Sequence, residues 1–240
     1  MTLHHLREAV CEANRALVTH RLVTLTWGNV SGRSEDGELL AIKPSGVPYE
    51  SLRPEQIVVL RLATGEAVEG DLRPSSDTPT HRVLYETFPA IGGITHTHSP
   101  RATAWAQARR ELPCFGTTHA DHFHGAVPVT RPLTAEEVAD AYEANTGRVI
   151  VERFAELDPA ATPGVLVAGH APFAWGGSPA KSVENAVALE AIAAMALDTL
   201  RIDDAAPALE NYVLDKHHDR KHGPGAYYGQ EDATNKADAT

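Results

Sequence analysis

At the start of the chain, hydrophobic positions recur with the three- and four-residue spacing of an amphipathic helix. The set is Leu3, Leu6, Val10, Ala13 and Leu17. A helix with 3.6 residues per turn gathers residues at this spacing on one face, which can then pack against a core. The pattern therefore predicts a helix over residues 3–19.

Short aliphatic and β-branched runs predict strands further along the chain, at residues 25–31, 39–42, 57–62, 93–98, 127–130, 165–168 and 173–175. Longer periodic segments predict helices at residues 78–87, 100–108, 134–145, 178–200 and 205–216. Asp77 stands at the N-cap position of the helix that starts at residue 78, and Pro79 suits its first turn. Thr134 and Glu137 have the spacing of a capping box.

Strands and helices interleave, but several connections are shorter than the dozen or so residues that a parallel crossover needs. We therefore expect an α/β fold, a single three-layer domain with a mixed, largely antiparallel central sheet and helices on both faces. A chain of 240 residues suits one domain of this kind. We expect the domain to span residues 1–230, and residues 231–240, which lack apolar periodicity, to form a disordered tail.

Composition narrows the class of protein. The net charge of -11 argues against nucleic-acid binding. No apolar run approaches the roughly 20 residues of a membrane span, and the N-terminal residues lack the apolar region of a signal peptide. We expect a cytoplasmic protein without a membrane partner. The two cysteines, Cys11 and Cys114, provide neither a disulfide framework nor a structural zinc motif.

The segment Gly93–Pro100 contains His96 and His98, two residues apart in a predicted strand. Alternate residues of a strand face the same side, so the two imidazoles lie next to each other. Zinc binds imidazole nitrogen at about 2.0–2.1 Å, and a third ligand is available in Asp77 or His170. Three histidines would leave a coordination position open, as in catalytic metal sites. The alternative is a pair of hydrogen-bonded histidines at a strand end.

Three loops, at residues 27–31, 43–47 and 74–77, combine glycine and serine in turns and resemble a phosphate cradle. Glycine lets a phosphate approach the backbone, and Ser75 and Ser76 precede a helix N-terminus, whose dipole favours an anion. Lys43 could add a positive charge. Each loop taken alone is more typical of an ordinary turn or cap, and none matches a P-loop or a dinucleotide fingerprint.

Two further segments are rich in titratable groups. Residues 117–125 include Asp121, which could shuttle a proton or could simply cap a turn. Residues 215–230 are basic and end in a glycine-flanked tyrosine pair. A tyrosine there could close over a substrate as an acid, whereas the charge run could also be a solvated face.

Taken in order, eight segments resemble the class II aldolase/adducin family. They are GNVSGR, KPSGV, PSSDTPTH, IGGITHTHSPRATAWAQA, GTTHADHFHG, PGVLVAGHAPFAWG, NAVALE and DKHHDRKHGPGAYYGQ. Together they extend over residues 28–230, nearly the whole chain. Each segment is weak evidence alone, but the ordered set is highly specific.

The resemblance implies a metal site and a substrate site. It implies Zn²⁺, with Mn²⁺ or another divalent metal as alternatives, held by His96, His98 and His170, with Asp77 as a further ligand or a base. It implies substrate and phosphate contacts from Gly28, Asn29, Lys43, Ser45, Gly46, Ser75, Ser76, Thr117, His217 and Arg220. It implies Asp121 and Tyr228 as the catalytic acid/base pair. It also implies a homotetramer with sites between subunits, in which Tyr228, His217 and Arg220 come from the adjacent chain.

Within the family, the GTTHAD segment and the closing AYYGQ resemble the 4-epimerases rather than the aldolases. The implied reaction inverts C4 and interconverts L-ribulose 5-phosphate and D-xylulose 5-phosphate. C4 is not α to the C2 carbonyl, so inversion requires retro-aldol cleavage of C3–C4 and re-addition. The alternatives are an aldolase of the fuculose or rhamnulose phosphate type, a 4-epimerase for another pentulose phosphate, and a non-catalytic adducin-like module.

Overall fold

The computed structural model describes residues 2–223, 226 and 227 of the chain. The helices are α1 (Leu3–Thr19), α2 (Thr78–Thr87), α3 (Pro100–Ala108), α4 (Thr117–Ala120), α5 (Ala135–Arg153), α6 (Pro179–Ile202) and α7 (Asn211–His222). The strands are β1 (Asn29–Arg33), β2 (Leu39–Ile42), β3 (Val58–Arg61), β4 (Ala67–Glu69), β5 (Gly93–His96), β6 (Gly164–Leu166) and β7 (Pro172–Gly176).

The strands form one seven-stranded sheet in the order β4-β3-β2-β1-β5-β7-β6. Every neighbouring pair in it is antiparallel, which confirms the largely antiparallel sheet predicted from the short connections. Within the described residues, the parallel component is limited to one isolated bridge between Val129 and Leu166. The central strand is β1, and the candidate metal-binding histidines lie at the end of β5 and just before the start of β7.

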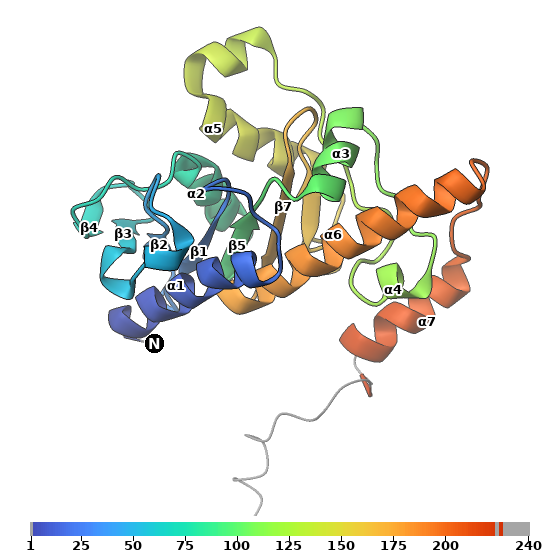
Figure 1. Ribbon diagram of the computed structural model, residues 1–240, viewed down its shortest axis with the longest axis horizontal. Helices are drawn as coiled ribbons and strands as arrows, with labels where there is room; N and C mark the ends of the chain where they lie inside the picture. Colours follow the sequence, from blue (N-terminus) through green and yellow to red (C-terminus); the bar gives the residue numbers. More distant parts are fainter. Residues whose placement is uncertain (1, 224–225, 228–240) are drawn as a thin grey trace, which may run out of the picture.

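Helices cover both faces of the sheet (Figure 1). On one face, α2 and α5 pack together over a core that includes Ile94 and Trp175. On the other face, α1 and α6 pack together over Val30 and Ala174. Adjacent residues of β7 thus enter different cores, as the alternation of a strand requires. The expected three layers are confirmed.

Most element boundaries agree with the sequence pattern, but five predictions were wrong in detail. The strand predicted at residues 93–98 ends at His96, so His98 lies in the loop that follows. The first strand begins at Asn29 rather than at residue 25, because Leu25 has φ 54° and Gly28 has φ 106° and both form turns. Residues 127–130 make isolated bridges only. Helix α5 continues to Arg153 across a kink at Ala141. Helix α7 begins at Asn211 rather than at residue 205.

Helix α7 packs against α4 beyond the edge of the main body, at the far end of α6 (Figure 1). Leu214 of α7 joins Cys114 and Ala120 in a small hydrophobic cluster that holds the two helices together. This arrangement matters because Asp121 directly follows α4, and the predicted substrate contacts His217 and Arg220 lie on α7. In the part of the chain that the structure describes, none of the helices is long and apolar enough to cross a membrane. The predicted tail, residues 231–240, lies outside the described residues.

Candidate functional site

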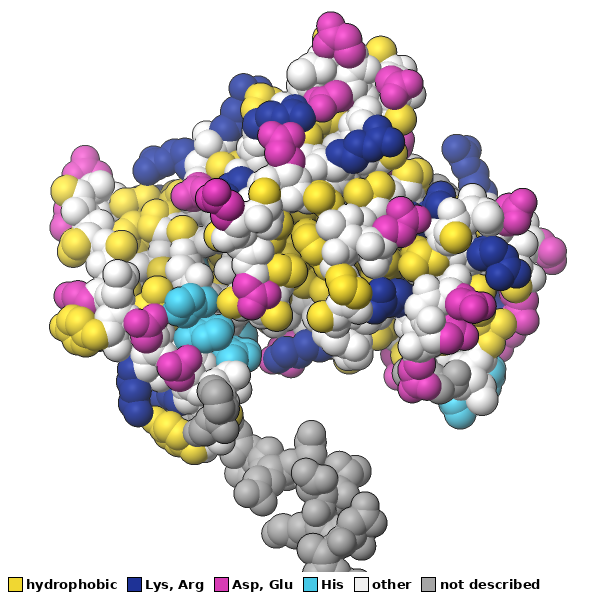
Figure 2. All heavy atoms as spheres, turned by 180° about the vertical axis from the view of Figure 1, so that it is seen from behind, with side chains coloured by type: hydrophobic (Ala, Val, Ile, Leu, Met, Phe, Trp, Pro, Cys, Tyr) yellow, Lys and Arg dark blue, Asp and Glu magenta, His cyan; other side chains and the backbone are white. Residues whose placement is uncertain are grey.

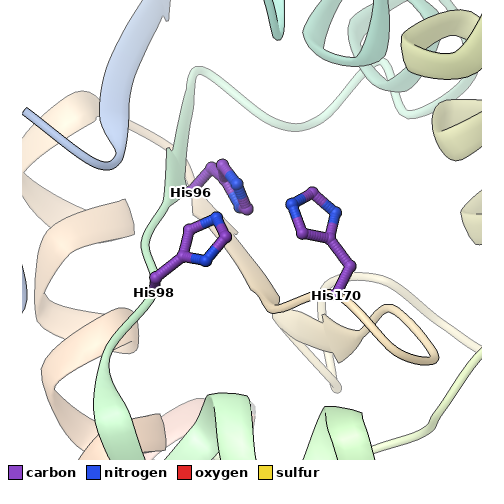
Figure 3. Close-up of side chains that lie close together, drawn as sticks. All are labelled: His96, His98 and His170. Carbon is purple, nitrogen blue, oxygen red and sulfur yellow. The ribbon is translucent and has the colours of Figure 1, made fainter.

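Three histidines converge at one end of the sheet. His96 is the last residue of β5, His98 follows it in the loop to α3, and His170 lies in the turn between β6 and β7. The ring centroids are 5.1 Å apart for His96 and His98, and 5.0 Å apart for each of the other two pairs. One nitrogen from each ring lies within 4.8 Å of the others. Figure 3 shows the three rings turned toward a common point.

The surroundings of the triad leave its nitrogens available to a metal. His96 Nδ1 lies 2.9 Å from the Pro172 carbonyl oxygen, to which it donates, so its Nε2 carries a lone pair. The ring of Phe173 stacks on that of His96 at 4.1 Å and 15°. Burial, together with the other two imidazoles, lowers the pKa of His170 to about 4 and keeps it neutral. Burial likewise lowers the pKa of His98, so His98 and His170 both favour the neutral form that binds zinc.

Asp77 lies beside the triad and is oriented by β1. The side-chain amide of Asn29 donates to Asp77 Oδ2 at 2.6 Å and to Ser75 Oγ at 3.1 Å. Burial alone would raise the pKa of the Asp77 carboxyl, but the His96 and His81 imidazoles and the Asn29 amide hold it below its usual value. Asp77 occupies the N-cap position of α2 as predicted, yet its side chain makes no capping hydrogen bond, because it turns toward Asn29.

The triad forms one wall of a cavity of about 510 Å³. The other walls come from the three loops that were predicted to form a phosphate cradle. The predicted residues that line it are Gly28, Asn29, Lys43, Ser45, Gly46, Ser75, Ser76, Asp77, His96, His98 and His170. The structure thus brings together segments of sequence that lie up to 142 residues apart (Gly28 and His170).

Lys43 is buried in the floor of this cavity, and among the described residues its hydrogen bonds include no anionic partner. Only 2 % of its surface is exposed, and its Nζ donates to the Pro44 carbonyl oxygen at 3.2 Å. The ammonium also lies 4.7 Å from the centre of the Tyr49 ring. Burial lowers the pKa of Lys43 to about 8. A buried ammonium that borders a cavity of serine hydroxyls and glycine backbone is suited to bind an anion such as phosphate.

Asp121 lies in a different place, at the end of α4. Arg220 of α7 donates to it twice, Nε to Oδ1 at 3.0 Å and Nη2 to Oδ2 at 2.7 Å. His217 Nδ1 lies 3.1 Å from Oδ1, and His222 Nε2 donates to the Asp121 carbonyl oxygen at 3.0 Å. Thr117 begins the same short helix, and its carbonyl oxygen accepts from the Asp121 N–H at 2.9 Å.

Asp121, Thr117, His217 and Arg220 form one cluster, the α4–α7 cluster, and none of the four lines the cavity of their own chain. The other predicted acid/base residue, Tyr228, lies outside the described residues. Further histidines gather over α7 (Figure 2): the His218 ring lies 4.8 Å from that of His124 and 4.7 Å from that of His222. A single chain therefore carries a metal and phosphate cavity on its main body and a separate group of titratable residues on α4 and α7.

Some residues near the triad were not singled out from the sequence. Trp27 is half-exposed at the cavity, with its ring 6.5 Å from that of His98. Tyr142, next to the kink of α5, has its ring 6.2 Å from that of His170. His81 is fully buried below Asp77. Trp27 and His81 lie within or beside the recognised segments, whereas no local pattern marks Tyr142, because the kink that presents it depends on the fold.

The donor set fits a divalent metal. Three neutral imidazoles with a carboxylate beside them match the ligands that zinc accepts. Nδ1 of His170 is buried and has no hydrogen-bond partner among the described residues, and a coordinated metal is one way to satisfy such an atom. A metal held by this donor set could act as a Lewis acid on a molecule bound in the cavity.

Comparison with known proteins adds independent findings. The family described as Class II Aldolase and Adducin N-terminal domain matches residues 8–197. The L-ribulose-5-phosphate 4-epimerase UlaF of Salmonella paratyphi C (strain RKS4594) is 49% identical over 229 residues, which cover 95% of this chain and 100% of the relative. The protein of the same name from Salmonella typhi is 48% identical over the same lengths.

Solved structures show the same fold. An L-fuculose 1-phosphate aldolase superposes with a TM-score of 0.76 at 23% identity, covering 90% of this chain and 95% of that chain. The L-fuculose-1-phosphate aldolase from Thermus thermophilus superposes with a TM-score of 0.63 at 25% identity, covering 85% of this chain and 98% of that chain. Both solved structures therefore share the overall fold of this chain.

Proposed function

The chain belongs to the class II aldolase and adducin family, and on that premise we propose that it is a metal-dependent L-ribulose-5-phosphate 4-epimerase. The observation that carries the proposal is the convergence of His96, His98 and His170 on one wall of a cavity whose other walls are the cradle loops. The similarity to 4-epimerases along nearly the whole chain supports the choice of substrate, L-ribulose 5-phosphate, and of product, D-xylulose 5-phosphate.

The reaction must invert C4, a carbon that is not α to the C2 carbonyl. Direct removal of the C4 proton is therefore unfavourable, since no enolate can delocalise the resulting charge. Cleavage of C3–C4 gives the enediolate of dihydroxyacetone and glycolaldehyde phosphate, and re-addition to the other face of the aldehyde completes the inversion. Zn²⁺ held by His96, His98 and His170 would supply Lewis-acid stabilisation of the negative charge that develops during this cleavage.

The cradle residues retain the aldehyde fragment between the two steps. Ser75 and Ser76 lie just before the N-cap of α2, and Gly46 has φ 70°, a left-handed turn that exposes its backbone. Lys43 adds a positive charge from the buried side. These groups would bind the phosphate while the aldehyde carbon rotates, so that the intermediate stays in the cavity and is not released as an aldolase product.

Asp121 and Tyr228 would exchange protons with the C4 oxygen from opposite faces of the aldehyde. Burial alone would raise the pKa of Asp121, but hydrogen bonds from Arg220 and His217 hold it below its usual value. Asp121 therefore acts from its ionised form as the base. A free tyrosine has a pKa near 10, so Tyr228 serves as the acid.

The position of the α4–α7 cluster supports a shared site. Thr117, Asp121, His217 and Arg220 lie together but away from the cavity of their own chain. We propose a homotetramer in which the α4–α7 cluster of one subunit, with Tyr228, completes the cavity of its neighbour. A cyclic assembly satisfies this requirement, because each subunit then gives its cluster to one neighbour and receives a cluster from the other. We further propose that the enzyme works in the cytoplasm.

The test is a product assay with the zinc-loaded protein and L-ribulose 5-phosphate, in which D-xylulose 5-phosphate and free glycolaldehyde phosphate are followed separately. Xylulose phosphate without free aldehyde is the expected result. Release of free aldehyde would instead identify an aldolase. Turnover of a different pentulose phosphate only would identify another 4-epimerase, and absence of bound metal and of any turnover would indicate the adducin-like alternative.

A further inference from the structure

Tyr49 contacts residues of two cradle loops, but it does not line the cavity itself. It is the first residue of a short 3₁₀ helix, Tyr49–Ser51, which follows the Lys43 loop. Only 1 % of its surface is exposed, and it packs with Leu17 and Val30 in the core beneath α1. A phenylalanine would fill this part of the core equally well. Packing alone therefore does not account for the hydroxyl group.

The hydroxyl group of Tyr49 fixes the first cradle loop. It donates to the Gly28 carbonyl oxygen at 2.7 Å, and the Trp27 carbonyl oxygen lies 3.3 Å away. Burial, with a smaller effect of the Glu50 carboxylate, raises the pKa of Tyr49 well above its usual value, so the phenol keeps the proton that makes this bond. The hydrogen bond therefore ties the backbone of the loop to the core of the protein.

The Gly28 backbone also lies against the end of β5. Gly28 has φ 106°, in the left-handed region that favours glycine. A Cβ atom added to it would lie 2.7 Å from the His96 carbonyl oxygen and 3.2 Å from Thr97 Cα, so only glycine allows this close approach. The Gly28 residue is thus in contact with both the metal-binding strand and the Tyr49 hydroxyl. A phosphate can approach its backbone because no side chain intervenes.

The ring of Tyr49 contacts the charge of the second cradle loop. Lys43 Nζ lies over this ring, 4.7 Å from its centre, which is within the range of a cation–π interaction. The same ammonium donates to the Pro44 carbonyl oxygen at 3.2 Å. Burial disfavours the charged form of Lys43 and lowers its pKa to about 8. The negative face of the ring favours the ammonium form and opposes this effect of burial.

We propose that Tyr49 is the positioning residue of the phosphate cradle: its ring holds the Lys43 ammonium, and its hydroxyl holds the Gly28 backbone beside the end of β5. Tyr49 does not contact the substrate. One rigid side chain, anchored in the core, thereby fixes the charge of one loop relative to the backbone of the other. The inference rests on the phosphate cradle of the proposed function, whatever sugar carries the phosphate.

The first test measures the binding of inorganic phosphate to the full-length, zinc-loaded protein by titration calorimetry. Tyr49→Phe removes the hydroxyl and keeps the ring, and phosphate should bind about 2–10-fold more weakly, the loss expected for one hydrogen bond. Tyr85→Phe is the matched control, because Tyr85 is equally buried and its hydroxyl lies 2.9 Å from Ser31 Oγ, whereas neither of these residues lines the cavity. Its phosphate affinity should equal that of the parent protein.

The second test measures the proton affinity of Lys43 without any substrate, by NMR titration of isotope-labelled lysine side chains. Lys43→Met identifies the Lys43 signal by its loss. Tyr49→Phe should titrate like the parent protein, because the ring is kept. A trifluorinated phenylalanine in place of Tyr49 has nearly the same shape but lacks most of the negative ring face, so the proton affinity of Lys43 should fall about 3–30-fold relative to Tyr49→Phe.

An unchanged titration of Lys43 in the fluorinated protein would overturn the role of the ring, since a residue that only packs does not respond to a change of its charge distribution at constant shape. Phosphate binding by Tyr49→Phe equal to that of the parent protein would overturn the role of the hydroxyl and leave the cradle intact. If the parent protein binds no inorganic phosphate, or if Lys43→Met binds it equally well, the cradle of the proposed function fails and the role of Tyr49 fails with it. Both replacements of Tyr49 preserve its packing, so the result does not depend on a disruptive variant.

Discussion

Arg220 and Asp121 form a bidentate salt bridge, in which Arg220 Nε lies 3.0 Å from Asp121 Oδ1 and Arg220 Nη2 lies 2.7 Å from Asp121 Oδ2. The planar guanidinium matches the carboxylate and fixes its plane, and His217 adds a third donor at 3.1 Å. The Asp121 side chain is 12 % exposed, so these contacts are partly shielded from water. Asp121 is thus an ionised carboxylate of fixed orientation at the C-terminal end of α4.

Replacement of Asp121 by asparagine is expected to reduce kcat at least about 100-fold, which is the contribution of a general base. Zinc content should remain at the parent level, because the metal ligands lie on the main body. Asp215→Asn is the matched control on α7, where Asp215 pairs with the exposed His124 at 2.8 Å. It should keep its activity. Full activity in Asp121→Asn would remove Asp121 from the mechanism.

The separation of the α4–α7 cluster from the cavity predicts complementation between inactive subunits. His96→Asn destroys the metal site but leaves the cluster intact, and Asp121→Asn does the reverse. A site that takes His96 from one subunit and Asp121 from its neighbour is intact in about a quarter of cases in a random 1:1 mixture, since each position is correct half of the time. Co-expression of two differently tagged variants and purification through both tags would provide the mixed oligomers.

Activity near a quarter of the parent value in mixed oligomers would support shared sites. The control is co-expression of His96→Asn with His98→Asn, which disable the same half of the site and should give no recovery. If mixed oligomers of His96→Asn and Asp121→Asn are as inactive as the separate variants, the catalytic residues belong to one chain and the proposed sharing fails.

The metal site was predictable because its signals are local. The two-residue spacing of His96 and His98 predicted adjacent imidazoles, although β5 ends at His96 and His98 lies in the following loop. A hairpin pattern placed His170 in a tight turn. The distances between the three rings depend on the β5–β7 register, in which His96 pairs with Phe173, and no local pattern specifies that register. The family resemblance supplied the grouping that periodicity alone left open.

Other features depend on contacts between distant segments and were missed. His81 looks from its sequence like a core residue of a helix, and its buried contact with Ser31, fifty residues earlier on β1, depends on the fold. Helix α7 was predicted at residues 205–216 from its alanines, but Pro207 lies in that segment and opposes a continuous helix. The observed helix is fixed where Leu214 can pack against Cys114. The kink at Ala141 is likewise spanned by a side-chain hydrogen bond, which the Asn145 amide donates to the Glu137 carbonyl oxygen.

The stacking of Phe173 on His96 predicts a link between core packing and metal affinity. Phe173→Leu should lower the free energy of unfolding by roughly 1–2 kcal/mol, less than the 3–5 kcal/mol of truncation to alanine. It should also weaken zinc binding, because the His96 ring loses the surface that fixes its plane. Phe123→Leu is the matched control, since Phe123 is equally buried but belongs to the other core around α3 and α6.

Urea unfolding and zinc competition measured on both variants separate the two effects. Both variants should lose a similar free energy of unfolding. Only Phe173→Leu should bind zinc more weakly than the parent protein. If both variants bind zinc like the parent protein, the stacked ring contributes to stability only and does not position His96.

The buried Lys43 predicts an alkaline limb in the pH profile. Its pKa of about 8 in the free protein means that the ammonium loses its proton above pH 8. The substrate phosphate is a dianion throughout the range from pH 7 to 9. A change of KM in this range therefore reflects titration of a group on the protein. Loss of the charge removes a charged hydrogen bond worth about 1.5–3 kcal/mol, so KM should rise about 10–100-fold across the limb.

The effect on stability has the opposite sign: between pH 8 and the unfolded pKa of 10.5 the unfolded chain binds more protons, so the Lys43 contribution to stability rises with pH.

Measurement of kcat/KM from pH 7 to 9.5 in the parent protein and in Lys43→Met checks this assignment. The variant should have a raised KM at every pH and no limb near pH 8. Lys181→Met is the matched control, because Lys181 is half-exposed, lies outside the cavity and pairs with Glu184 at 2.6 Å, and it should retain the limb. A limb that persists unchanged in Lys43→Met belongs to another group, and Lys43 would then not be the charge that binds the phosphate.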